Sequence, residues 1–153
     1  MRKLIILLLA LSFLIMWGVL LAFSKEGVDM GYLITTVIFS ALPLIFIILI
    51  WKEQSIIEKF PALIFFTRRD EVDESLWNSL VHGFFDILGI TGVLISAYLI
   101  VVQYTAFDYI RRRDVPNPEF FITFAVITPM VIFAIFLYMM YRLASRVEDS
   151  SGS

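Results

Sequence analysis

The sequence contains no cysteine and a single histidine among its 153 residues. The chain therefore cannot by itself supply a disulfide, an iron–sulfur cluster, a cysteine zinc site or a bis-histidine haem site, and no cofactor is expected. Charged residues are also scarce, at 17%, and 12 basic and 14 acidic groups leave a net charge of −2. Because no basic field is present, a nucleic-acid partner is not expected either.

Sequence motifs that carry chemistry are missing as well. The chain has no Ser-His-Asp arrangement, no HExxH motif, no glycine-rich phosphate loop and no pair of carboxylates within an apolar run. It also lacks the arginine repeats of a voltage sensor, a TVGYG-like filter and the inverted repeat of many transporters. We therefore expect no enzyme activity from this chain alone.

What the sequence has in abundance is apolar residues, which make up 60% of the chain and give it a mean hydropathy of +0.90. They are concentrated in four blocks of about twenty residues, each long enough to cross a hydrocarbon core of about 30 Å. Backbone groups in lipid must be satisfied internally, and no strand-like alternation is present, so the blocks are predicted to be helices. The prediction is an all-α integral membrane protein, a four-helix antiparallel bundle with spans at residues 4–23, 31–51, 83–107 and 120–141.

The segments between the blocks refine this prediction. The first is so short that spans one and two must be antiparallel neighbours. Residues 55–67, which include Phe60 and Phe65, are too few to span and predict a short interfacial helix. The third helix is expected to run from about Glu74 to Arg113, and Pro118 fits the first position of the fourth helix.

The ends of the chain and its basic residues predict the orientation. Arg2 and Lys3 precede an apolar run without a small-x-small cleavage site, which is typical of a retained signal anchor. If the N-terminus is cytoplasmic, eight basic residues lie inside and four outside, although the triplet Arg111, Arg112 and Arg113 opposes this count. We expect one domain over residues 1–147, a flexible tail over 148–153, and cytoplasmic termini in the plasma membrane.

The predicted third helix carries the one patterned run of small and polar residues. They recur every seven positions and fall on one stripe of the helix, at Ser75, His82, Gly89, Ser96 and Gln103. Gly92 and Ser96 add a small-xxx-small spacing that lets another backbone approach. The stripe is expected to meet protein rather than lipid, mainly for packing.

Asp86 lies inside the same apolar block, one turn from His82, and the two could hydrogen-bond or pass a proton. Their role depends on depth, because a carboxylate deep in lipid costs about 2.5–3.5 kcal/mol on insertion scales, whereas one near the interface costs much less. Two hypotheses stay open: an interfacial structural carboxylate, and a proton or cation pathway lined by Asp86, His82, Ser96 and Gln103.

The function predicted from these features is a non-catalytic accessory or scaffolding subunit of a larger membrane complex. Its partners would be other membrane-protein subunits or further copies of the chain, together with lipids. The expected contact residues are Gly89, Gly92, Phe60, Phe65, Arg111, Arg112 and Arg113. The alternatives are a small oligomeric transporter or proton/cation conductor that uses Asp86 and His82, and a membrane enzyme subunit whose cofactor comes from a neighbour.

Overall fold

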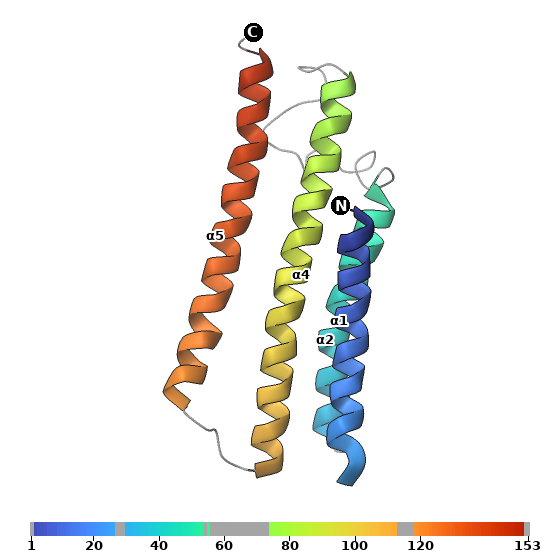
Figure 1. Ribbon diagram of the computed structural model, residues 1–153, viewed down its shortest axis with the longest axis vertical. Coiled ribbons are helices and arrows are strands. Elements are labelled where there is room, and N and C mark those ends of the chain that lie inside the picture. The colour runs from blue at the N-terminus through green and yellow to red at the C-terminus, as the bar shows by residue number, and fades with distance from the viewer. Residues whose placement is uncertain (1, 27–29, 54, 56–73, 113–117, 152–153) are drawn as a thin grey trace.

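The computed structural model describes residues 2–26, 30–53, 55, 74–112 and 118–151. Within these ranges the chain forms four long helices, α1 (Arg2–Phe23), α2 (Met30–Trp51), α4 (Glu74–Arg112) and α5 (Pro118–Ser151), and the short 3-10 helix η1 (Ser24–Glu26) follows α1 (Figure 1). All four long helices have the length and hydropathy needed to cross a membrane. The predicted all-α fold with four helices of membrane-spanning length is therefore confirmed.

The observed bounds of α4 and the start of α5 agree with the predicted ones, whereas α5 ends later than its apolar block does. α4 begins at Glu74 and ends at Arg112, close to the predicted limits, and α5 begins with Pro118 at its first position. However, α5 continues to Ser151, about ten residues beyond its apolar block. The residues between Tyr141 and Ser151 include no proline or glycine, so nothing local ends the helix before Gly152.

Three of the helices, α1, α2 and α4, pack against one another, and α5 packs on the outside of α4. Figure 1 shows α4 between α5 on one side and the α1–α2 pair on the other, and both chain termini lie toward the same end. The predicted antiparallel bundle of all four helices is not confirmed, because α5 does not close it against α1 and α2.

Apolar side chains form a core cluster at three places in this arrangement. One lies near the N-terminus of α1, where Ile5 and Leu9 of α1 meet Ile50 of α2, and Ile90 and Val93 of α4 pack against them. A second joins the same helices near their other ends, through Leu20, Tyr32 and Phe107. The third lies between the first turns of α4 and the last turns of α5 and comprises Trp77, Leu80, Val81, Phe84, Phe85, Ile87 and Leu143.

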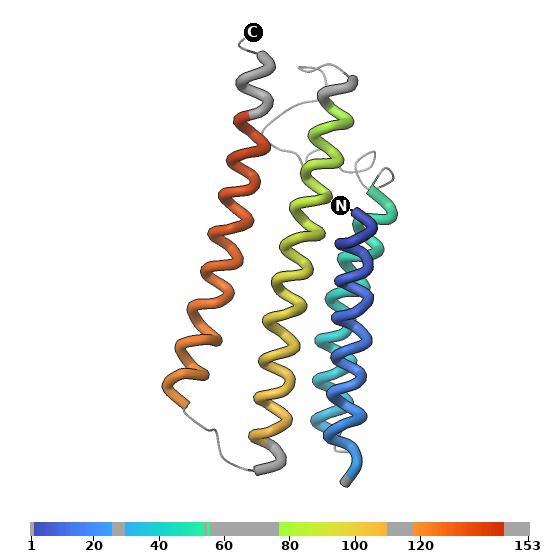
Figure 2. The backbone as a smooth tube through the Cα atoms, in the orientation of Figure 1, coloured from blue at the N-terminus to red at the C-terminus, as the bar shows by residue number. Residues whose placement is uncertain are grey.

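At the end where the N-terminus lies, α4 and α5 reach further than α1 and α2 do (Figure 2). We call these extensions, held together by the Trp77–Leu143 cluster, the two-helix arm. The predicted interfacial helix, with Phe60 and Phe65, falls outside the described residues, as does Arg113.

Candidate functional site

Four polar residues from three helices meet at the end of α1. The Arg2 guanidinium contacts a Glu53 carboxylate oxygen at 2.7 Å and Asp86 Oδ1 at 3.0 Å. The same guanidinium donates a hydrogen bond to the backbone oxygen of His82, at 3.3 Å. His82 Nδ1 also lies 3.3 Å from the other Glu53 oxygen, Oε1. This charged network therefore links α1, the residues after α2, and α4.

The network also fixes the level of Asp86 relative to the helices around it. Arg2 is the first residue of α1, and Glu53 is the second residue after the end of α2 at Trp51, so both mark the ends of spans. From Asp86 to Asp108 along α4 is about 33 Å at the helical rise, close to the thickness of a hydrocarbon core. Asp86 thus lies at the level where the α1 and α2 spans end. The positive charge of Arg2 is paired with its carboxylate.

Within the network, the two carboxylates face the guanidinium. Glu53 is almost fully buried, with 9% of its side chain exposed, whereas 58% of the His82 side chain is exposed. No group of three histidine, aspartate or glutamate side chains among the described residues is arranged to hold a metal ion. The arrangement is suited to fastening the start of α1 and the residues after α2 to the side of α4, by ion pairs and charge-assisted hydrogen bonds.

Sequence reasoning singled out His82 and Asp86 but missed Arg2 and Glu53 as their partners. One signal was present: a basic residue before span one and an acidic residue after span two must lie at the same membrane surface when the two spans are antiparallel.

The small residues of the α4 stripe pack against α1 and α2 of the same chain. A Cβ added to Gly89 would lie 2.6 Å from Ile5 Cγ2 and 2.9 Å from Ile50 Cδ1, and one added to Gly92 would lie 2.6 Å from the Phe46 ring. Such distances are shorter than carbon atoms tolerate, so these positions allow helix approach that a side chain would block. The expected packing role of this face is thus fulfilled within the chain.

The polar members of the stripe are buried in the same three-helix interior. Ser96 and Gln103 are fully buried. Gln103 Nε2 donates hydrogen bonds to the backbone oxygen of Met16, at 3.0 Å, and to Thr36 Oγ1, at 2.8 Å, which ties α4 to both α1 and α2. Ile5, Leu9 and Ile50 form an apolar layer between this pair and the charged network. The structure therefore places His82 and Asp86 in one network, joined through Arg2 and Glu53, and Ser96 and Gln103 lie beyond the layer.

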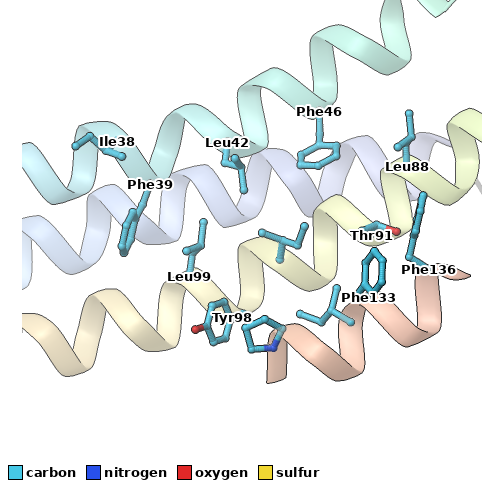
Figure 3. A pocket seen from close by; sticks show the side chains of 13 residues that line it. Ile38, Phe39, Leu42, Phe46, Leu88, Thr91, Tyr98, Leu99, Phe133 and Phe136 are labelled. Atoms are coloured by element: carbon cyan, nitrogen blue, oxygen red, sulfur yellow. The ribbon is translucent and has the colours of Figure 1, made fainter. Parts of the chain in front are cut away.

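A cavity of about 660 Å³ lies between α2, α4 and α5. Figure 3 shows its side chains converging from the three helices, and we call it the lateral slot. Its lining is apolar except for Thr91 and Tyr98, and comprises Ile38, Phe39, Leu42, Phe46, Leu88, Thr91, Ile95, Tyr98, Leu99, Pro129, Ile132, Phe133 and Phe136. Beyond Tyr98, whose hydroxyl donates to the Ala125 oxygen at 2.9 Å, a second cavity of about 390 Å³ separates α4 from the start of α5.

Neither of these two cavities is lined by His82, Asp86, Ser96 or Gln103. The other predicted contact residues are placed only in part: Arg111 and Arg112 lie in the last turn of α4, at the end of the helix opposite His82.

Fold and surfaces together define a small all-helical protein with four helices of membrane-spanning length. A comparison with protein-family models, curated proteins and solved structures finds no match of any kind.

Proposed function

We propose that this chain is a non-catalytic accessory or scaffolding subunit of a larger membrane complex, and that α5 is the helix that docks partner helices. The observation that carries the proposal is the exposure of α5. In its most apolar window only 6% of the residues are buried, against 22 to 33% in the windows of the other three helices. At 100° per residue, Ile127, Val131 and Tyr138 fall on the face of α5 opposite the residues that line the lateral slot, and their exposed fractions are 50%, 49% and 59%.

A membrane helix gains stability from close packing with other helices, because lipid tails are as apolar as its own side chains and supply no hydrophobic drive. α1, α2 and α4 gain this packing from one another, whereas α5 gains it mainly from α4. A partner helix on the outer face of α5 would supply the missing packing. The proposal thus moves the expected partner surface from the α4 stripe, which α1 and α2 occupy, to α5.

The two-helix arm provides a second contact surface in this proposal. α4 has twelve residues before Asp86, or about 18 Å of helix beyond the level of the charged network. Its apolar seam with α5 would keep the two helices paired outside the lipid. Given the predicted cytoplasmic termini, the arm would face the cytoplasm and reach soluble parts of a complex.

The competing hypothesis, a proton or cation conductor that uses Asp86 and His82, has less support. Asp86 is paired with Arg2, and Gly89, in the next turn, is packed tightly against Ile5 and Ile50. A conducting pathway needs room for water or ions beyond the carboxylate, and this packing leaves little. If conduction nevertheless occurs, Asp86→Asn should abolish it without loss of assembly.

Site-specific photo-crosslinking in native membranes tests the scaffold proposal. A benzophenone amino acid at Val131, on the outer face of α5, should give covalent adducts with other proteins or with a second copy of the chain. The control places the same group at Leu14, which is 63% exposed on α1. Adducts at Val131 and not at Leu14 support the proposal. A lack of protein adducts at Val131, with recovery of the gently extracted chain as a lone monomer, would reject it.

A further inference from the structure

We propose that the lateral slot binds one acyl chain of a phospholipid whose head group lies beside Lys52 and Arg142. This inference is independent of the proposed function, because the slot and the outer face of α5 are different surfaces.

The dimensions of the slot match a single acyl chain. Along α4 the lining extends from Leu88 to Leu99, about 16 Å at the helical rise, which is close to half of a hydrocarbon core. A partner helix that crosses the whole membrane would need about twice this length. The slot therefore suits an occupant that enters from one leaflet and ends near the bilayer midplane.

The depth of the slot is consistent with the same occupant. Leu88 lies two residues beyond Asp86, about 3 Å below the level of the charged network, and Leu99 lies about 20 Å below it. The slot thus starts just beneath one membrane surface. It ends near the Tyr98–Ala125 hydrogen bond, where α5 meets α4 again. A chain attached to a head group at that surface would fill it from its upper rim downward.

Basic side chains lie at one level above this rim. Lys52 is six residues beyond Phe46, just after the end of α2, and Arg142 is six residues beyond Phe136 on α5, so each lies about 9 Å above that lining residue. Both are exposed, and neither forms an ion pair with a carboxylate in the part of the chain that the structure describes. Arg142 donates only a hydrogen bond to the Tyr138 hydroxyl, at 3.4 Å. Long basic side chains at this level can reach a phosphate.

Inside the slot, Thr91 is 9% exposed and its hydroxyl has no hydrogen-bond partner among the described residues. Thr91 lies about 8 Å below the level of Asp86 at the helical rise. A buried hydroxyl without a partner is costly in lipid. The carbonyl oxygen of an acyl ester near the top of the slot would accept a hydrogen bond from the Thr91 hydroxyl.

Native mass spectrometry tests the proposal. The full-length chain is released from nanodiscs made of equal parts phosphatidylglycerol and phosphatidylcholine. Wild type should retain one phospholipid per chain. Leu42→Trp fills the slot and should lower the retained fraction about tenfold, whereas Leu44→Trp, at an exposed position on the same helix, should leave it unchanged.

A second pair of variants tests the head-group contact. Lys52→Gln combined with Arg142→Gln should weaken retention of phosphatidylglycerol by about tenfold, whereas Lys25→Gln, at the other end of the spans, should not. Helical content and monodispersity, measured for every variant, identify any that fail to fold. Leu42→Ala, which leaves the slot open, should still retain lipid.

The proposal is overturned if Leu42→Trp folds and retains as much lipid as Leu44→Trp, or if the two basic substitutions leave phosphatidylglycerol retention unchanged. A second copy of the chain or another protein that is displaced by Leu42→Trp would make the slot a protein-docking surface and would also overturn it. Crosslinks from Val131 report on a different face, so the scaffold proposal can fail while this one stands.

Discussion

At the scale of single residues, Arg2 is the side chain on which the end of the three-helix core depends. It contacts two carboxylates from different helices, and one of them, Glu53, is almost fully buried. A buried carboxylate that loses the guanidinium paired with it keeps the cost of desolvation and loses the compensating attraction. Arg2 should therefore contribute more to stability than an exposed basic residue beside it.

Arg2→Gln is expected to lower the free energy of unfolding by about 1–3 kcal/mol, because it leaves Glu53 without its cation. Unfolding in detergent, followed by tryptophan fluorescence, measures the loss. Lys3→Gln removes the same charge from the next residue, which is exposed, and should change stability by less than about 0.5 kcal/mol. Adding Glu53→Gln to Arg2→Gln should recover part of the loss. Equal effects of Arg2→Gln and Lys3→Gln would contradict the role given to the network.

At the scale of helices, the glycines of α4 differ sharply from the glycine of α1. Gly89 lies against two isoleucines of neighbouring helices, while a Cβ at Gly18 would meet no atom within 4 Å. Isoleucine has little rotamer freedom in a helix, so Ile5 cannot easily move aside. The helix-to-helix distance between α1 and α4 is therefore set at Gly89.

Gly89→Ala should destabilise the protein by about 1–3 kcal/mol through overpacking. Gly18→Ala should be neutral or slightly stabilising, because alanine favours the helix and meets open space. Denaturant titrations of the two purified variants compare them directly. If Gly89→Ala proves as stable as Gly18→Ala, α1 and α4 are not in the close contact described above.

The helices themselves could largely be predicted from the sequence, because length, hydropathy and terminal signals act locally. Pro118 marked the start of α5, and Gly89, Ser96 and Gln103 of the seven-residue stripe lie on the face of α4 that meets other helices. α5 continues about ten residues past the predicted span, since the apolar block stops at Tyr141 while helix-forming residues continue. An apolar block predicts which part of a helix can be embedded in lipid, and it does not predict where the helix ends.

At the scale of the whole molecule, the packing of α1, α2 and α4 into one core, with α5 on the outside of α4, could not be predicted. An apolar side chain in a membrane helix is compatible with both lipid and protein neighbours, so the sequence of α5 does not indicate how many helices cover it. The Arg2–Glu53–Asp86 contacts likewise join residues that are far apart in the chain. The scaffold and lipid proposals both arise from this arrangement, in which α5 leaves one face and one slot uncovered.

Every proposal above requires that the spans cross lipid, with the charged network at one membrane surface and η1 at the other. The chain has no cysteine, so single cysteines can be introduced without background at Lys3, Lys25 and Lys52. A membrane-impermeant maleimide applied to sealed vesicles should label Lys25→Cys from the side opposite to Lys3→Cys and Lys52→Cys. Labelling of all three positions from the same side would contradict the account.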